Sequence, residues 1–197
     1  MNRDSIIYVV IFTFFTAFVF VFLIALADNA TAAQVARNQE LVTAEAFLNV
    51  VGKQSDSSEQ ALADFKNLFG QVEGEAVVKA NVDGTPMLVK QFHGQGLWGT
   101  VTGVVATDAA VERFIGLDII SHAETPGLGG RIEEDWFKEQ FRGEKILPEG
   151  ITFRKGEGGA DSDSENSAVD GITGASLTSA AMEVIINNEI KTLREAK

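Results

Sequence analysis

The chain opens with an uncharged apolar run that restricts where the whole molecule can reside. The run extends from Ile6 to Ala27, contains no charged residue and is rich in Phe, Val and Ile. It is longer than the ~20 apolar residues that a helix needs to cross a hydrocarbon core of ~30 Å. We therefore predict a transmembrane helix over residues 6–27 and a membrane anchor over residues 1–27.

Two other interpretations of this run are a cleaved signal peptide and a buried helix of a soluble protein. Ala25-Leu26-Ala27 has the small-x-small pattern of a cleavage site, but the run exceeds the usual h-region of about 7 to 15 residues, which favours a retained anchor. Arg3 precedes the run, whereas Asp28 follows it and the next basic residue is Arg37. The positive-inside rule then predicts a single-pass protein of the cell inner membrane, with a cytoplasmic N-terminus and residues 28–197 on the periplasmic side.

The composition excludes several classes of function. The formal net charge is -12 and the pI is about 4.6, which argues against binding to nucleic acid or to anionic lipid. Cysteine is absent, so the chain has no disulfide, no thiolate ligand for an iron–sulfur cluster and no cysteine nucleophile. His93 and His122 lack metal-ligand spacing, and no G-x-S-x-G motif is present. We predict neither a metal site nor catalytic residues within this chain alone.

After the anchor, the pattern predicts helices and then strands. Residues 28–70 form a helical stalk over 32–51 and a short helix with a Ser57/Gln60 capping box. From residue 71 onward, β-rich runs alternate with turns. Strands are predicted over 76–82, 87–92, 100–107, 111–121 and 151–154, helices over 134–141 and 180–195, and an acidic loop over 157–166. Mostly antiparallel strands with helices segregated to one side indicate an α+β fold, with a single domain over residues 71–197.

The stretch from Asp170 to Ser179 places four hydroxyls and two glycines directly before the last predicted helix. The first-turn N–H groups of a helix are unpaired, and its macrodipole makes that end partly positive. An anion such as phosphate is therefore stabilised here, because Gly174 and Ala175 keep side-chain bulk away from it. The alternative is an ordinary N-cap provided by one of the four hydroxyl residues, which are Thr173, Ser176, Thr178 and Ser179.

Two glycine-rich loops offer surfaces for a planar ligand. Residues 94–99 match G-x-G-x-x-G, but a strand follows them where a dinucleotide fingerprint needs a helix. We expect the aromatic face of Trp98 to receive a planar ring instead; the alternative is a hairpin whose tryptophan packs in the core. In residues 124–130, Pro126 stiffens a backbone whose exposed N–H groups can bond the polar edge of a planar ligand, with Leu128 against the ring; the alternative is an ordinary loop.

The motif Asp170-x-x-Thr173-Gly174-Ala175-Ser176-x-Thr178 resembles the flavinylation motif of the FMN-binding domain family. The resemblance implies that FMN is attached covalently, through a phosphodiester that a separate flavin transferase installs. Ser176 is then the acceptor by position, where the family usually has threonine. Thr178 and Thr173 are the fallback acceptors.

The order of the motifs resembles one branch of that family. His93-Gly-x-Gly-Leu-Trp98, Glu124-Thr-Pro-Gly-Leu-Gly-Gly130, Lys155-Gly156 and the flavinylation motif follow one another as in the C subunit of the sodium-pumping NADH:quinone reductases. The G subunit of the Rnf ferredoxin:NAD oxidoreductases shares part of this order. The resemblance implies a set of cofactor-binding residues: Gly96, Leu97, Trp98, Glu124, Thr125, Gly127, Leu128, Gly129, Lys155, Asp170, Thr173, Gly174, Ala175 and Thr178.

The function that this resemblance implies is an electron-transfer subunit of a redox-driven ion pump, with other membrane subunits of the same oxidoreductase complex as partners. Lys155 would place a cation near the flavin N1/C2 edge and favour reduced anionic forms; the alternative is an exposed lysine at a strand end. Two further functions stay open from the sequence. One is an anchored flavodomain that serves a separate extracytoplasmic reductase, and the other is a scaffold domain without redox chemistry.

Overall fold

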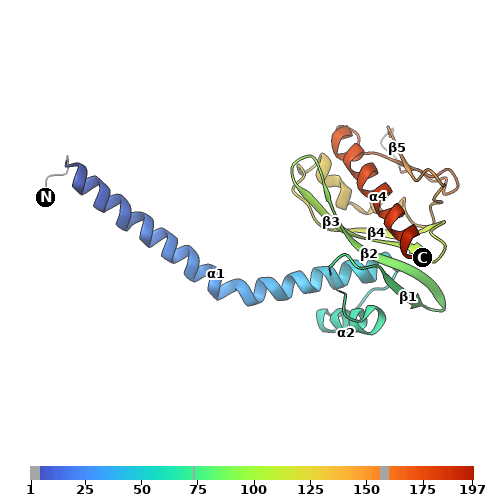
Figure 1. Cartoon of the computed structure of the whole chain (residues 1–197), viewed down its shortest axis with the longest axis horizontal. Coiled ribbons are helices and arrows are strands. Elements are labelled where there is room, and N and C mark those ends of the chain that lie inside the picture. Colours follow the sequence, from blue (N-terminus) through green and yellow to red (C-terminus); the bar gives the residue numbers. More distant parts are fainter. Residues whose placement is uncertain (1–4, 73, 156–159) are drawn as a thin grey trace. The chain divides into compact units, whose positions relative to one another are not determined.

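The structure, a computed structural model, describes residues 5–72, 74–155 and 160–197 (Figure 1). Arg3, Gly156 and the first part of the predicted acidic loop, residues 157–159, lie outside the described residues. Contacts within the chain divide it into two parts, Met1–Glu40 and Leu41–Lys197.

The N-terminal part is the beginning of one continuous helix, α1, which runs from Ile6 to Val50. It contains both the predicted membrane span and the predicted stalk. Its large apolar side chains between Ile6 and Leu26 are exposed, and by length and composition the helix could cross a membrane. Phe14, Phe18 and Phe22 recur every fourth residue, so their rings stack along one side of the helix at centroid distances of 6.5 and 6.3 Å.

The second part is built around an antiparallel sheet, which confirms the predicted α+β fold. Its four strands lie in the order in which they follow one another along the chain: β1 (Val78–Val82), β2 (Thr85–Gln95), β3 (Thr100–Asp108) and β4 (Phe114–Ser121). The G-x-G-x-x-G segment is the turn between β2 and β3, as its strand-like continuation predicts. A nucleotide-binding helix does not follow it, because Thr100 pairs with Gln95 across the hairpin.

A second, small sheet departs from the prediction. It consists of β5 (Thr152–Arg154) and β6 (Ala168–Asp170), which pair in parallel. The sequence predicts β5 but not β6. Two other predicted elements are shorter than expected, because β4 begins only at Phe114 and the helix expected over 134–141 is the five-residue α3 (Asp135–Glu139) after the 3₁₀ helix η1 (Gly129–Glu133).

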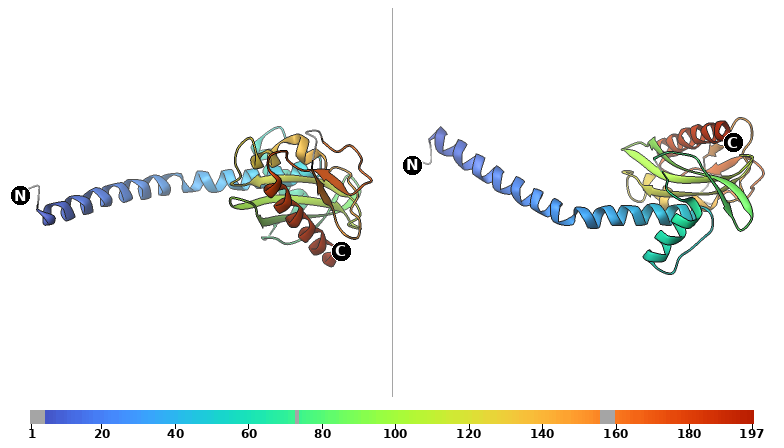
Figure 2. Two further views of the ribbon diagram at one scale, coloured as in Figure 1. Left: turned by 90° about the horizontal axis from the view of Figure 1, so that it is seen from above. Right: turned by 60° about the horizontal axis from the view of Figure 1, so that its bottom comes forward.

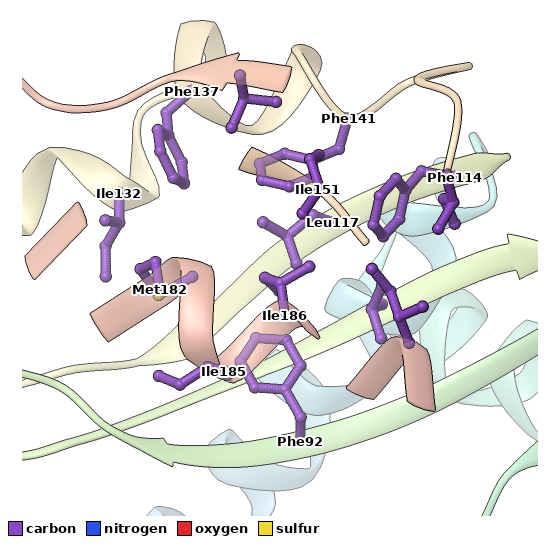
Figure 3. Close-up of a cluster of buried hydrophobic side chains, with 14 of the residues drawn as sticks. Phe92, Phe114, Leu117, Ile132, Phe137, Phe141, Ile151, Met182, Ile185 and Ile186 are labelled. Carbon is purple, nitrogen blue, oxygen red and sulfur yellow. The ribbon is translucent and has the colours of Figure 1, made fainter. Parts of the chain in front are cut away.

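Helices cover both faces of the main sheet (Figure 2). Each face has its own hydrophobic core. Helix α4 (Ser176–Ala196) covers one face, where Met182, Ile185 and Ile186 pack against Phe92 of β2 and the aromatic residues of α3 (Figure 3). The other face is covered by the last turns of α1 and by α2 (Ser58–Phe69). Ser57 caps α2 by accepting the Gln60 N–H at 3.3 Å, as the predicted capping box requires.

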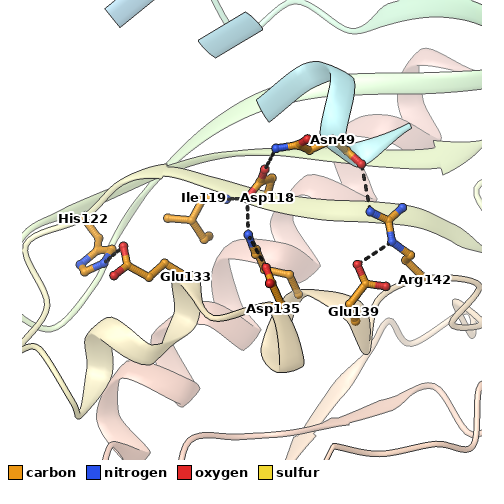
Figure 4. Close-up of polar contacts among 9 residues, drawn as sticks. Asn49, Asp118, Ile119, His122, Glu133, Asp135, Glu139 and Arg142 are labelled. Carbon is orange, nitrogen blue, oxygen red and sulfur yellow. Dashed lines mark hydrogen bonds and ion pairs between the residues drawn. The ribbon is translucent and has the colours of Figure 1, made fainter. Parts of the chain in front are cut away.

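A polar cluster fixes the end of α1 to this sheet (Figure 4). Asn49 Nδ2 donates to the Asp118 carboxylate at 3.0 Å, and Lys138 Nζ contacts the other oxygen of the same carboxylate at 3.1 Å. Arg142 donates to the Asn49 carbonyl at 3.0 Å. Burial alone would lower the pKa of Lys138, but the Asp118 and Asp135 carboxylates together outweigh burial and raise the pKa of this lysine. The cluster therefore favours charged Lys138.

Candidate functional site

The site begins where α4 begins. The helix starts at Ser176, four residues earlier than predicted, so the Ser/Thr cluster forms its first turn. Ala175 is the N-cap residue and makes no side-chain capping bond, so none of the hydroxyls acts as the ordinary cap that the alternative interpretation requires. Ser179 instead fixes the preceding turn, because its hydroxyl accepts the Ile172 N–H at 2.9 Å and donates to the Ala175 carbonyl at 3.0 Å.

The three candidate acceptor hydroxyls differ in exposure. Thr178 is buried, and its hydroxyl donates to Glu124 Oε2 at 2.6 Å. Thr173 and Ser176 are exposed. In the described part of the chain, no residue hydrogen-bonds to the Ser176 hydroxyl. Of the three, Ser176 therefore combines an accessible oxygen with a position at the helix N-terminus.

An apolar hollow of about 280 Å³ lies on one side of Ser176. Three segments that are distant in sequence line it: Leu97 and Trp98, then Glu124, Thr125, Leu128 and Gly129, then Gly174 to Thr178. Several large apolar side chains of this hollow stay exposed, and Trp98 is the most exposed of them at 68%. Because Trp98 is exposed, the alternative prediction, in which this tryptophan packs in the core, is wrong.

The Glu124 carboxylate joins the three segments beneath the apolar hollow. It is 4% exposed; its Oε1 accepts the Trp98 backbone N–H at 3.0 Å, and its Oε2 accepts the Thr178 hydroxyl. The Glu124 N–H donates to His122 Nδ1 at 3.1 Å, which places the proton of that imidazole on Nε2, 3.3 Å from a Glu133 oxygen. Glu124 is thus held by one hydrogen bond from its backbone N–H and by two hydrogen bonds to its carboxylate.

A second hollow, of about 410 Å³, lies on the other side of Ser176. Its lining is more polar: Phe153, Arg154, Lys155, Gly171, Ile172, Thr173, Ser179, Ala180 and Glu183, with Gly174 and Ser176 shared with the apolar hollow. Glu183 accepts the Phe153 N–H at 3.0 Å. Lys155 therefore borders Ser176 but is not among the residues that line the apolar hollow.

Three residues predicted to bind the cofactor line neither hollow. Gly96 lies behind the Glu124 carboxylate, Gly127 is in the turn before η1 with a φ of 74°, and Asp170 ends β6, where its backbone bonds the Gln140 amide. Leu177, which lines the apolar hollow and is 65% exposed, was missed by sequence reasoning. The sequence pattern could have indicated its exposure, because Leu177 is an apolar residue outside the buried helix face that Met182, Ile186 and Ile190 define.

Comparison with known proteins relates this part of the chain to one family. The profile of the family described as FMN-binding domain matches residues 96–191. The C subunit of the Na(+)-translocating NADH-quinone reductase of Vibrio vulnificus is 33% identical over 122 residues, which is 61% of this chain and 48% of that protein. The same subunit of Chlamydia muridarum is 32% identical over 123 residues, covering 54% of this chain and 39% of the relative. The match thus spans half or less of these curated relatives.

A solved structure agrees over more of the chain. The crystal structure of the C subunit of the Na(+)-translocating NADH-quinone reductase from Parabacteroides distasonis aligns with a TM-score of 0.67 and 26% identity. The alignment covers 80% of this chain and 92% of the other. The family profile covers β3, β4 and most of α4, and the motif of residues 170–178 lies within it at the start of α4. Residues 96–191 of this chain are therefore similar to the FMN-binding domain family, and the chain shares its fold with the C subunit structure.

Proposed function

We propose that this chain carries FMN on Ser176 through a phosphodiester and relays electrons as a membrane-anchored subunit of a redox-driven, ion-translocating NADH:quinone oxidoreductase. The observation that carries the proposal is the position of the Ser176 hydroxyl. It is exposed, begins α4 and borders both the apolar hollow and the second hollow, whereas the Thr178 hydroxyl is bonded to Glu124.

The residues around Ser176 fit an FMN group. The apolar hollow offers an exposed indole and exposed leucine side chains to a planar apolar ring, and Gly174 adds no side chain beside the attachment oxygen. The hydroxyl at the helix start suits the other end of the cofactor, because unpaired first-turn N–H groups and the helix dipole stabilise the charge of a phosphodiester. When bound, FMN supplies the capacity to pass one or two electrons.

The chain's own residues then have separate tasks. Ser176 tethers the cofactor, which prevents its loss to an extracytoplasmic medium. Trp98, Leu97 and Leu128 shield one side of the ring from water. The N–H groups of Glu124, Leu128 and Gly130 are bonded within the chain, so the polar edge of the ring has only the other N–H groups of this segment to contact. Lys155 lies toward the second hollow, so we assign its charge to the phosphate end of FMN rather than to the ring.

Helix α1 supports the proposal of a single-pass anchor in the cell inner membrane, with the flavin domain on the periplasmic side. Such an anchor would keep the flavin close to neighbouring membrane subunits of the same complex, which we propose as its electron-transfer partners. A flavin transferase is the maturation partner. The C subunit of the Na(+)-translocating enzymes is the relative on which this assignment rests.

The test is attachment of flavin in a cell that supplies the transferase. The full chain is co-expressed with a flavin transferase, denatured, and separated by gel electrophoresis for in-gel flavin fluorescence. We expect a fluorescent band for the wild type, for Thr173→Ala and for Ser176→Thr, and no fluorescence for Ser176→Ala. Fluorescence that persists in Ser176→Ala would refute attachment at this residue, and a wild type without fluorescence would refute covalent attachment altogether.

A further inference from the structure

We propose that Glu124 is a positioning residue, which fixes the turn of residues 96–99 against the first turn of α4 and so prepares the aromatic side of the apolar hollow. The purpose of this arrangement rests on the proposed FMN function. The arrangement itself rests only on contacts within the chain.

The first observation is that one buried carboxylate bridges two segments that are distant in sequence. Its Oε1 accepts a backbone N–H from Trp98 at 3.0 Å, and its Oε2 accepts the hydroxyl of Thr178 at 2.6 Å. Because Thr178 is two residues from Ser176, the bridge ties the turn that carries Trp98 to the proposed attachment point.

The second observation is that the chain leaves room for this carboxylate on two sides. A Cβ at Gly96 would lie 2.5 Å from Glu124 Oε1, and a Cβ at Gly129 would lie 2.7 Å from Oε2 and 2.4 Å from the Thr178 hydroxyl oxygen. These distances are far below van der Waals contact. Glycine is therefore required at both positions for the bridge to exist, which links the two glycine-rich loops to one side chain.

The third observation is that little else holds Trp98. Its side chain is 68% exposed, so burial does not fix it. The turn closes on itself through one backbone bond, from the Gly96 N–H to the Gly99 carbonyl at 2.8 Å, and this bond does not reach α4. Among the described residues, the hydrogen bonds that connect this turn to α4 run through Glu124.

If Glu124 acts by holding the turn in position, the length of its side chain must matter. Glutamine has the same reach as glutamate, and it can accept the Trp98 N–H with Oε1 and donate to the Thr178 oxygen with Nε2. Aspartate keeps the charge but is one methylene shorter, so it cannot meet both partners. Glu124→Gln should thus behave like the wild type, whereas Glu124→Asp and Glu124→Ala should free the turn. If charge alone mattered, Glu124→Asp would behave like the wild type and Glu124→Gln would free the turn.

The first measurement uses the full chain in detergent without flavin. Hydrogen exchange is followed by mass spectrometry in peptides that cover residues 96–99. We expect the Trp98 amide to exchange faster in Glu124→Ala and Glu124→Asp than in the wild type and Glu124→Gln. Gly129→Ala should reproduce the faster exchange while keeping every polar group. Unchanged exchange of the turn in Glu124→Ala and Gly129→Ala, or faster exchange in Glu124→Gln with Glu124→Asp unaffected, would overturn the proposal.

Glu183 provides the matched control. It is a glutamate of α4 whose carboxylate accepts the Phe153 N–H at 3.0 Å beside the second hollow. Glu183→Ala removes a carboxylate-to-backbone bond near Ser176 as well, so it reports any general loosening of α4. We expect faster exchange in residues 152–154 and an unchanged turn at residues 96–99. A loosened turn in this control would mean that Glu124 has no specific role.

The second measurement uses the flavin-loaded chain. Emission is measured per bound flavin, so the amount of flavin attached to Glu124→Ala does not enter, and this emission should rise as Trp98 leaves the ring. Attached flavin with unchanged emission would overturn the positioning role. A wild type that receives no flavin would refute the proposed function instead, while the exchange measurement would still decide the role of Glu124.

Discussion

The two hollows beside Ser176 differ in chemistry although they share that residue and Gly174. The apolar hollow is lined by exposed Leu and Trp side chains, whereas the second hollow contains Arg154, Lys155 and Glu183. A cofactor with an apolar ring and an anionic phosphate needs both environments. The first residue of one helix can therefore separate an apolar from a polar environment, because α4 has different neighbours on its two sides.

The hollows also differ in how they are held. The sides of the apolar hollow come from the β2–β3 turn and the segment after β4, joined by Glu124. The second hollow is bounded by β5 and the turn after β6, where Glu183 and Ser179 bond the backbone. Each hollow can therefore be disturbed separately. Both hollows depend on the buried face of α4.

The largest effect is expected from Ile186→Ala, which disturbs both hollows at once. Ile186 is fully buried in the core beneath α4, so truncation should lower the free energy of unfolding by about 2–5 kcal/mol. Urea unfolding of the detergent-solubilised chain, followed by circular dichroism, measures this loss. Val184→Ala is the control on the same helix, and because Val184 is 62% exposed its effect should stay within about 0.5 kcal/mol.

A smaller effect should separate the two hollows. In a Ser176→Ala background, where FMN can bind only reversibly, Trp98→Ala removes ring stacking worth about 0.5–1.5 kcal/mol, so FMN affinity should fall by up to roughly tenfold. This fall should not depend on salt. Lys155→Ala should also weaken FMN binding, but its effect should shrink as ionic strength rises, since exposed charges are screened.

Titration of free FMN fluorescence at low and high salt measures both affinities. The assignment of the ring to the apolar hollow fails if Trp98→Ala leaves the affinity unchanged. A salt-independent effect of Lys155→Ala would place that lysine against the ring instead of the phosphate.

Loss of one backbone contact at the second hollow should cost about 1 kcal/mol. Glu183→Ala leaves the Phe153 N–H without its partner, and a net protein hydrogen bond is typically worth about 0.5–1.5 kcal/mol. Chemical unfolding gives the change in stability, and Glu183→Gln, which keeps an acceptor oxygen, serves as its control. Equal losses in both variants would show that the charge of Glu183 matters rather than this bond.

The smallest effect concerns Glu144, which supports β6 by accepting the Ala168 N–H at 3.1 Å. Burial raises the pKa of Glu144, against the lowering effect of that backbone bond. The folded chain thus holds the proton more tightly than the unfolded chain. As the pH falls from neutral through the raised pKa toward the ordinary glutamate value, the wild type should gain stability relative to Glu144→Gln.

Unfolding measured at several pH values between neutral and the ordinary glutamate pKa tests this sign. A difference between wild type and Glu144→Gln that is flat, or that grows toward neutral pH in favour of the wild type, would contradict the raised pKa. The same variants also report on the second hollow, because β6 leads directly into Gly171 and the turn before Ser176.

Local patterns in the sequence were enough to predict much of the fold. The hairpin at Gly84, the strand after Gly99 and the apolar face of α4 follow from turn chemistry and periodicity, which act over a few residues. Strand β6 could not be predicted this way. It has three residues, and its partner is β5, from which the predicted acidic loop separates it, so its pairing depends on tertiary contacts.

The candidate site was predicted as a set of residues but not as an arrangement. The structure places Trp98, Leu128 and Ser176, all of them in the predicted set, around one hollow. Lys155 belongs to the other hollow, because the path of the chain after β5 decides on which side of α4 it lies. The bridging role of Glu124 also escaped sequence reasoning, since a side chain that links a backbone N–H to a distant hydroxyl leaves no local pattern.

The central claim is that FMN is bonded to the Ser176 oxygen at the start of α4. The most direct test is mass spectrometry of peptides from the full chain, purified from its native membrane. We predict one peptide that carries the mass of FMN joined through phosphate, with fragment ions that place the group on Ser176. An unmodified Ser176 peptide, or fragment ions that place the group on Thr173 or Thr178, would contradict the account.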